Sequence, residues 1–446
     1  MTGWVDVDRG LVSRRIFVEE EIYQQELDRI FARCWLFLGH ESQIPRPGDF
    51  FTTFMGEDGV IVCRDTRGEI RALLNSCRHR GNRVCRLDGG RAHSFMCTYH
   101  GWTYDLQGNL IGVPGYEECY HGELDREQWG LIPVAQVASY KGLIFGTFDP
   151  EAPALEEYLG DIRWGMDILL DQRVGGTELA GGVFKWLMNC NWKLGADNFI
   201  GDNYHGSTTH RSAGMVGHRT EQRNPESRNR EHEVLNRPGF TVSTEYGHGF
   251  NAALRPPGED ALAGVPEPLG SYYRSTSAEV EPRLGRLRAR EVARINCGVF
   301  PNLSLSSSSM MLHVWHPRGP TKTELWLYTL VDRDAPPEVK RTFRQMAQRH
   351  FSPSGMFEQD DGENWEQSTL AAMGAVARRY PLNYQMGLGH ETFVRDGDGP
   401  ARWNSLMNEH NQRAYYKRWA EMMSAGSWND GLQPETKNEA VQPYGC

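Results

Sequence analysis

Two short Cys/His sequences constrain this chain more than any other feature. They lie in one stretch, CRHRGNRVCRLDGGRAHSFMCTYHGW, which covers residues 77–102. The first is Cys77-x-His79, and the second, after seventeen intervening residues, is Cys97-x-x-His100. Thiol and imidazole groups at such spacing are typical of a metal site. A Cys₂His₂ zinc site is the simplest interpretation of these residues.

The order of the ligands favours a different metal. Zinc fingers usually pair cysteine with cysteine and histidine with histidine, whereas here each pair contains one of each. A Rieske-type [2Fe-2S] cluster needs two cysteines on one iron and two histidines on the other. Two loops that each supply one Cys and one His can hold such a cluster from both sides. The spacing therefore favours a Rieske cluster.

The residues next to these pairs support the iron–sulfur interpretation. Gly81 and Gly101 follow the two ligand loops directly. Glycine lets the backbone approach a cluster closely and donate N–H bonds to sulfur. Tyr99 and Trp102 are expected to shield the cluster from water.

Composition excludes several other classes of protein. The chain has 446 residues, a net charge of −10 and interspersed charges, which argues against nucleic-acid binding. It contains no apolar stretch of about 18 residues, so we expect no membrane span. The nine cysteines are scattered and odd in number, unlike a disulfide framework. With no signal-peptide pattern at its start, the chain is expected to be cytoplasmic.

Hydrophobic patterns divide the chain into regions with different predicted secondary structure. Residues 19–35 have helical spacing, and residues 36–150 contain short β-type runs with hairpin turns. A larger region follows, with helices and long strands such as the apolar run at residues 321–332. Residues 220–290 are rich in Arg, Glu, Pro and Gly, and we expect loops or a flap there.

A second set of metal-ligand residues lies in NWKLGADNFIGDNYHGSTTH. Asp202 and His205 are three residues apart, so on a helix they share a face. His205 and His210 would point about 140° apart on a continuous helix. They can converge only if the helix ends near residue 205, and Gly206 permits a break there.

Two histidines and one carboxylate form the facial triad that leaves positions open on ferrous iron. An iron of this kind could receive the electrons that a Rieske cluster delivers one at a time. The stretch FEQDDGENW offers four acidic side chains for the third ligand, and periodicity does not choose among them. They are Glu358, Asp360, Asp361 and Glu363.

The motif Cys-x-His-Arg-Gly followed by Cys-x-Tyr-His-Gly-Trp resembles the Rieske domain of bacterial aromatic-ring-hydroxylating oxygenases. The resemblance covers nearly the whole chain and is to the large (α) subunit of the naphthalene/biphenyl-type dioxygenases. It implies that His205, His210 and Asp361 hold the mononuclear iron. It also implies catalytic roles for Asp202, as an electron bridge to His100 of a neighbouring subunit, and for Asn198.

The resemblance also implies a fold. We expect an α+β protein in which an all-β Rieske domain is inserted into a catalytic domain with a large antiparallel sheet flanked by helices. The expected bounds are 1–37 for the N-terminal part of the catalytic domain, 38–155 for the Rieske domain and 156–446 for the rest of the catalytic domain.

The implied activity is addition of both atoms of O₂ to an arene, giving a cis-dihydrodiol. No GxGxxG motif follows a predicted strand, so the chain is not expected to bind a nicotinamide itself. Electrons from NADH would arrive through a reductase and a ferredoxin. The implied assembly is a ring of three large subunits, α3β3 with small β subunits or α3 without them.

The resemblance suggests a mostly apolar pocket lined by Phe199, Asn296, Phe351 and Phe357, with Trp315 nearby. Arg294 is expected to point outward; if it faced the pocket, it could pair with a carboxylated arene. A Rieske monooxygenase or demethylase would use the same metals. An electron carrier or a zinc-stabilised binding protein is the remaining alternative, and it would make the second set of ligands a coincidence.

Overall fold

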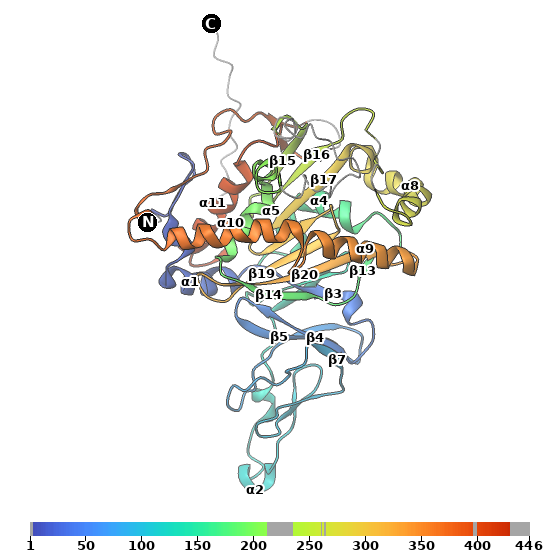
Figure 1. Cartoon of the computed structure of the whole chain (residues 1–446). Helices are drawn as coiled ribbons and strands as arrows, with labels where there is room; N and C mark the ends of the chain where they lie inside the picture. The colour runs from blue at the N-terminus through green and yellow to red at the C-terminus, as the bar shows by residue number, and fades with distance from the viewer. Residues whose placement is uncertain (1–2, 212–234, 260, 263–264, 396–398, 429–446) are drawn as a thin grey trace.

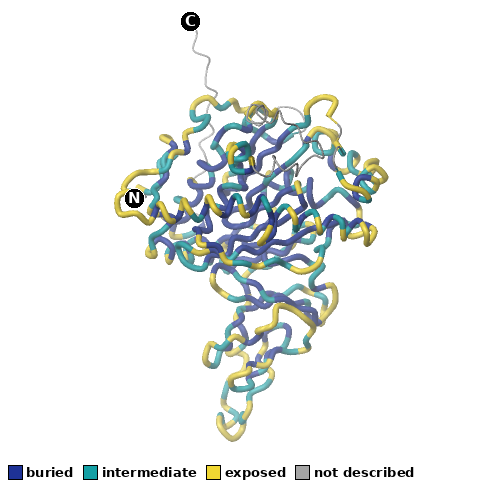
Figure 2. Tube along the Cα trace, in the orientation of Figure 1, coloured by how far each residue is buried: buried dark blue, intermediate teal, exposed yellow. Residues whose placement is uncertain are grey.

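The structure is a computed structural model, and it describes residues 3–211, 235–259, 261–262, 265–395 and 399–428. Figure 1 shows a broad upper part built around a large sheet and a narrower lower part that ends at α2 (Tyr116–Tyr120). In Figure 2 the buried residues concentrate in the sheet, and the lower tip is largely exposed. None of the helices in the described segments is both long and apolar enough to cross a membrane.

The upper part contains an antiparallel ten-stranded sheet, as expected for this fold class. Its order is β13-β20-β19-β18-β17-β16-β15-β23-β22, and β14 also pairs with β20. The apolar run predicted at residues 321–332 forms β20, and nearly all of its residues are buried in the main core. The strands are β13 (Thr177–Leu179), β14 (Phe184–Met188), β15 (Gly239–Ser243), β16 (Gly249–Leu254), β17 (Val292–Val299), β18 (Leu303–Ser306), β19 (Met311–Pro317), β20 (Thr323–Asp332), β22 (Phe393–Val394) and β23 (Arg402–Trp403).

Helices cover both faces of this sheet. On β17, Ile295 and Cys297 point toward Gly165 of α4, whereas Gly298 lies against Ile200 of α5. Because side chains alternate along a strand, α4 and α5 pack on opposite faces. The helices are α1 (Glu20–Glu26), continued by a π-helical turn over Leu27–Phe31, α3 (Leu155–Leu159), α4 (Ile162–Leu170), α5 (Trp192–Gly201), α8 (Leu269–Arg286), α9 (Pro337–His350), α10 (Met356–Ala372) and α11 (His410–Ser424).

The expectation of loops across residues 220–290 is wrong for most of the part that the structure describes. Strands β15 and β16 and helix α8 lie there, while residues 212–234 fall outside the described segments. Helix α8 is mostly exposed and contains Pro282 and a non-helical Gly285. The exposed face, the proline and the glycine give this segment a polar composition that is typical of loops, which is why the sequence did not predict the helix.

The lower part is built from β-sheets, as predicted, with the short helix α2 at its tip. A four-stranded sheet has the order β6-β5-β4-β7, and two three-stranded sheets have the orders β10-β9-β8 and β11-β12-β3. A second core cluster, separate from the main core, includes Cys77, Cys97, Trp102 and Tyr104. The strands are β3 (Leu36–His40), β4 (Asp49–Met55), β5 (Asp58–Arg64), β6 (Ile70–Leu74), β7 (Gly89–Arg91), β8 (Phe95–Met96), β9 (Thr103–Tyr104), β10 (Leu110–Gly112), β11 (Gln136–Tyr140) and β12 (Leu143–Thr147). A small separate sheet joins β1 (Val5–Asp6), β2 (Leu11–Val12) and β21 (Leu382–Asn383).

Candidate active site and metal centres

Two matching tight turns carry the first set of Cys and His residues. The Gly81 N–H donates to the Cys77 carbonyl at 2.8 Å, and the Gly101 N–H donates to the Cys97 carbonyl at 2.9 Å. Both glycines have a φ near +74°, a conformation that favours glycine. The N–H groups of the two glycines therefore close the turns. The expected backbone N–H bonds to sulfur come from the neighbouring residues Tyr99 and His100, which donate to the Cys97 sulfur.

The side chains of these turns converge. The His79 and His100 ring centroids are 4.4 Å apart, and Cys77 and Cys97 are both buried. The Nδ1 atom of His79 is buried and has no hydrogen-bond partner among the described residues. Burial, with the nearby His100, lowers the pKa of His79 and so favours the neutral imidazole that binds metals. Two thiols and two imidazoles in this arrangement fit a Rieske cluster.

Neighbouring residues complete the surroundings of this set. Trp102 is buried and stacks on His79, with ring centroids 5.0 Å apart, whereas Tyr99 is 59% exposed beside His100. Sequence reasoning missed two polar contacts to sulfur. The Tyr104 hydroxyl lies 3.2 Å from Cys77 Sγ, and the Asn82 side-chain amide lies 3.5 Å from Cys97 Sγ. Hydrogen bonds to sulfur tune the potential of an iron–sulfur cluster.

The second set converges beside the large sheet. Ligand atoms of His205, His210 and Asp361 all lie within 4.8 Å of one another. Asp361 Oδ1 is 3.5 Å from His205 Nε2 and 3.4 Å from His210 Nε2. Two imidazoles and one carboxylate at this separation fit the donor set of a non-haem ferrous iron.

The helix break that allows this convergence comes earlier than predicted. Helix α5 ends at Gly201, and Asp202 has an extended backbone with φ −77° and ψ 100°. His205 then lies in a short 3₁₀ turn over Tyr204–Ser207. The expectation of a break at Gly206 was therefore wrong by about one turn, because Asp202 itself leaves the helix.

Helix α10 supplies the carboxylate and separates the four acidic candidates. Asp361 is buried and faces both histidines, whereas Asp360 lies 3.4 Å from His210 Nδ1. Glu358 is buried against His313, and Glu363 is exposed.

Electrostatic coupling links these groups. Burial is the main reason that the pKa of Asp361 rises to about 8, and nearby carboxylates add to the rise. Asp202 Oδ2 lies 3.2 Å from His205 Nδ1. Burial lowers the pKa of His205, but the Asp202 charge outweighs it and leaves the pKa raised. A divalent cation would relieve both the carboxylate repulsion and the need for protons at this site.

An aromatic wall extends from the second set. The His210 ring contacts Phe357 at 4.9 Å, Phe357 contacts Phe351 at 5.5 Å, and Phe351 contacts Phe199 at 6.5 Å between centroids. Trp315 lies behind Phe199 with its indole N–H donated to Ser304.

The polar residues Asn296, Asn198 and Arg294 have different surroundings. Asn296 accepts a hydrogen bond from Ser306 at 2.8 Å, and Asn198 is half-buried one turn before Asp202. The expectation that Arg294 points outward is wrong. Its guanidinium donates to Asn203 Oδ1 at 2.5 Å, and its charge acts to lower the pKa of His205.

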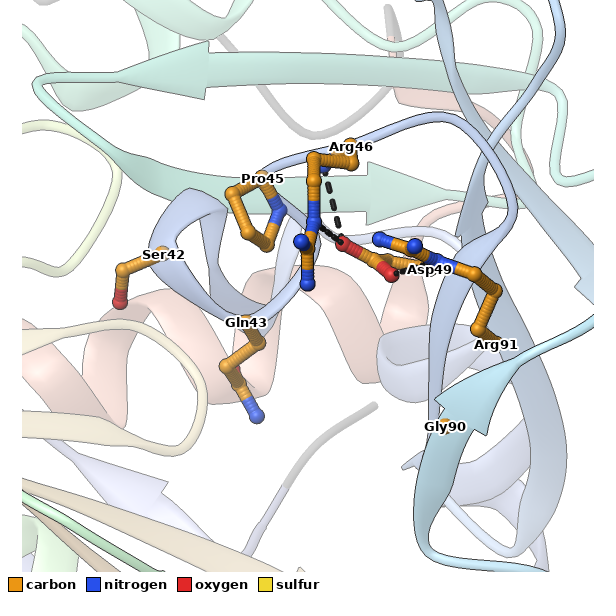
Figure 3. Close-up of a pocket in the computed structure, with 7 residues that line it drawn as sticks. All are labelled: Ser42, Gln43, Pro45, Arg46, Asp49, Gly90 and Arg91. Carbon is orange, nitrogen blue, oxygen red and sulfur yellow. Dashed lines mark hydrogen bonds and ion pairs between the residues drawn. The ribbon is translucent and has the colours of Figure 1, made fainter.

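A surface hollow of about 530 Å³ lies elsewhere, at β4 and β7 (Figure 3). Arg91 and Arg46 both pair with Asp49 there, at 2.8 and 3.6 Å. None of the residues that line the hollow belongs to the Cys/His set of residues 77–100 or to the set of His205, His210 and Asp361. We therefore do not assign catalysis to the hollow. Its lining is Ser42, Gln43, Pro45, Arg46, Asp49, Gly90 and Arg91.

Comparison with known proteins agrees with this geometry. Residues 155–425 match the model of the ring hydroxylating alpha subunit (catalytic domain), and residues 34–140 match that of the Rieske [2Fe-2S] domain. The chain is 41% identical over 429 residues to a biphenyl 2,3-dioxygenase subunit alpha of Rhodococcus jostii, covering 95% of this chain and 91% of the relative. It is 40% identical over 430 residues to a benzene 1,2-dioxygenase subunit alpha of Pseudomonas putida, covering 95% and 93% of the two chains.

The fold agrees as well. A crystal structure of naphthalene 1,2-dioxygenase from Rhodococcus sp. bound to indole superposes with a TM-score of 0.84 at 39% identity, covering 94% of this chain and 95% of that one. The matched domains imply a Rieske cluster and a mononuclear iron as the cofactors. The chain therefore belongs to the family of ring-hydroxylating dioxygenase alpha subunits, the Rieske non-haem iron oxygenases.

Proposed function

We propose that the chain is the terminal oxygenase component that adds both atoms of O₂ to an aromatic ring and yields a cis-dihydrodiol. The observation that carries the proposal is the convergence of His205, His210 and Asp361 beside an aromatic wall. In our assignment these three residues hold the iron. Cys77, His79, Cys97 and His100 hold the cluster.

Ferrous iron held by His205, His210 and Asp361 would supply the chemistry that activates dioxygen for oxidation of an aromatic ring. Residues of the chain would orient the iron ligands and hold the substrate. Asp202 Oδ2 lies 3.2 Å from His205 Nδ1 and would orient the His205 ring, as carboxylates do for histidine ligands. Phe357 and Phe351 present ring edges and faces to an apolar substrate and exclude water from beside His210.

The substrate we propose is a hydrophobic arene of one or more rings. Three aromatic side chains, Phe199, Phe351 and Phe357, form the continuous wall, and stacked or edge contacts favour an aromatic guest. The relatives named for biphenyl and benzene are consistent with this class.

We also propose that the oxygenase works as a ring of subunits with small β subunits, served by a ferredoxin and an NADH-dependent reductase. Figure 1 supports the ring: the segment with residues 77–102 lies in the lower part, whereas α5 and α10 cross the upper sheet. His100 would then meet Asp202 of a neighbouring copy.

Product analysis under ¹⁸O₂ tests the proposed function. The purified chain, with its electron-transfer partners and NADH, is incubated with arenes of one to four rings. We expect a cis-dihydrodiol that carries both labelled oxygen atoms. A product with one labelled atom would instead identify a monooxygenase. His205→Ala is the matched control, since it should abolish product and keep the cluster.

A further inference from the structure

Behind the aromatic wall lies a buried polar pair that the proposed reaction does not use. His313 of β19 and Glu358 of α10 are both fully buried, and His313 Nε2 lies 3.1 Å from Glu358 Oε2. Their remaining atoms, His313 Nδ1 and Glu358 Oε1, are buried with no hydrogen-bond partner among the described residues. Burying two ionisable groups with two polar atoms left unpaired costs free energy, so a hydrophobic pair of similar volume would be expected here if stability alone mattered.

The surroundings of the pair are aromatic. The His313 ring is stacked on Trp315 at an interplanar angle of 9° and lies 4.4 Å from the Phe199 ring and 5.9 Å from the Phe351 ring. These contacts fix the plane of the imidazole. Among the described residues, the His313 ring is hydrogen-bonded to Glu358, in a direction that its position on β19 sets.

Glu358 links the His313 hydrogen bond to the proposed iron site, because it lies on the same helix as Asp361. Glu358 and Asp361 are three residues apart on α10, so their side chains leave the same face of the helix. A hydrogen bond that anchors Glu358 to the sheet also fixes the rotation of α10 about its axis. That rotation determines where the Asp361 carboxylate points relative to His205 and His210.

We propose that His313 and Glu358 are positioning residues that aim the Asp361 carboxylate at the iron. The inference rests on the proposed function, because it takes Asp361 as a ligand. Partners behind metal ligands typically contribute about 10–100-fold in metal affinity or activity. The pair would act through α10 and would touch neither the iron nor the substrate.

The test compares variants by anaerobic ferrous iron titration and by the EPR spectrum of the nitric oxide adduct of the mononuclear iron. A single His313→Ala change leaves a buried carboxylate unpaired and could prevent folding. The main variant is therefore His313→Leu with Glu358→Met, which removes both polar groups at similar volume. We expect full cluster content, about tenfold weaker ferrous iron binding and an altered EPR spectrum.

Two further variants sharpen this result. Glu358→Gln keeps a hydrogen-bond acceptor for His313, so its iron affinity should stay within about threefold of wild type. This change is smaller than the loss of affinity expected when the hydrogen-bond partner is removed. The control variant is Arg173→Met with Asp332→Asn. These residues form another buried pair, with charged atoms 3.7 Å apart, and the change should leave iron binding unchanged.

The outcomes separate the two proposals. Wild-type iron affinity and spectrum in the double variant would overturn the positioning role and leave the proposed function intact. A wild-type protein that takes up no mononuclear iron would overturn the proposed function and the positioning role with it.

Discussion

At the level of single residues, the proposed iron site is formed by buried groups that the fold brings together from distant parts of the chain. Asp361 and His205 are 156 positions apart in sequence, and their ligand atoms are 3.5 Å apart. The sequence motifs predicted the residue types of both sites. They did not predict the inward direction of Arg294 or the His313–Glu358 pair, because no local pattern reports which residues meet across a helix and a sheet.

Removing one proposed iron ligand should separate the two metal sites. His205→Ala leaves two ligands for the iron, so we expect turnover to fall at least about a hundredfold. The [2Fe-2S] cluster should be unaffected, because its cysteine ligands Cys77 and Cys97 lie in the separate hydrophobic core of the lower part. Visible absorption and the EPR signal of the reduced cluster check this result. Turnover at the wild-type rate would show that His205 does not bind the iron.

A buried carboxylate on α5 gives a pH-dependent prediction. Asp197 accepts hydrogen bonds from Tyr384 and Tyr416, and burial raises its pKa from 3.8 to about 7. The native state therefore binds a proton that the unfolded state releases, and this contribution to stability is lost as pH rises from about 4 to about 7. Between about pH 5.5 and pH 7.5 the loss is about 2 kcal/mol.

The variant Asp197→Asn should remove this part of the pH dependence. The measurement is the difference in thermal unfolding midpoint between the two pH values, for wild type and variant. The wild-type midpoint should fall more than that of the variant as pH rises. Equal changes in the two proteins would mean that Asp197 does not carry the proton.

At the scale of elements, the strongly patterned segments were predictable. The helix predicted at residues 19–35 is present over Glu20–Phe31, and the apolar run at 321–332 forms β20. Helix α8 was missed because few of its side chains are buried, so its sequence lacks an apolar face. Strands β15 and β16 are short and owe their existence to pairing with neighbours, which composition does not reveal.

The packing of α5 on the sheet depends on a glycine. A Cβ atom at Gly195 would overlap the Trp315 ring, which is itself buried beside Phe199. Gly195→Ala should therefore destabilise the protein by about 1–3 kcal/mol, although alanine favours helix. Gly182→Ala is the matched control, since nothing lies within 4 Å of the added atom. Thermal unfolding of both variants measures the effect, and equal midpoints would contradict the close approach.

At the scale of the whole molecule, the proposed assembly explains why one chain carries two centres in different parts (Figure 1). Asp202 is 30% exposed and contacts His205, so it can accept a further partner from outside the chain. In Asp202→Asn both metals should remain and turnover should stop. Stopped-flow reoxidation of the reduced cluster, with substrate and oxygen present, checks the bridge. Reoxidation at the wild-type rate would refute it.

Metal analysis of the purified protein tests whether the chain holds two separate iron centres. We predict two irons and two sulfides per chain from the [2Fe-2S] cluster and one further iron held by His205, His210 and Asp361. In His210→Ala the further iron should be lost while the sulfide content stays the same. Zinc in place of iron, or loss of iron and sulfide together in that variant, would contradict the assignment of two separate iron centres.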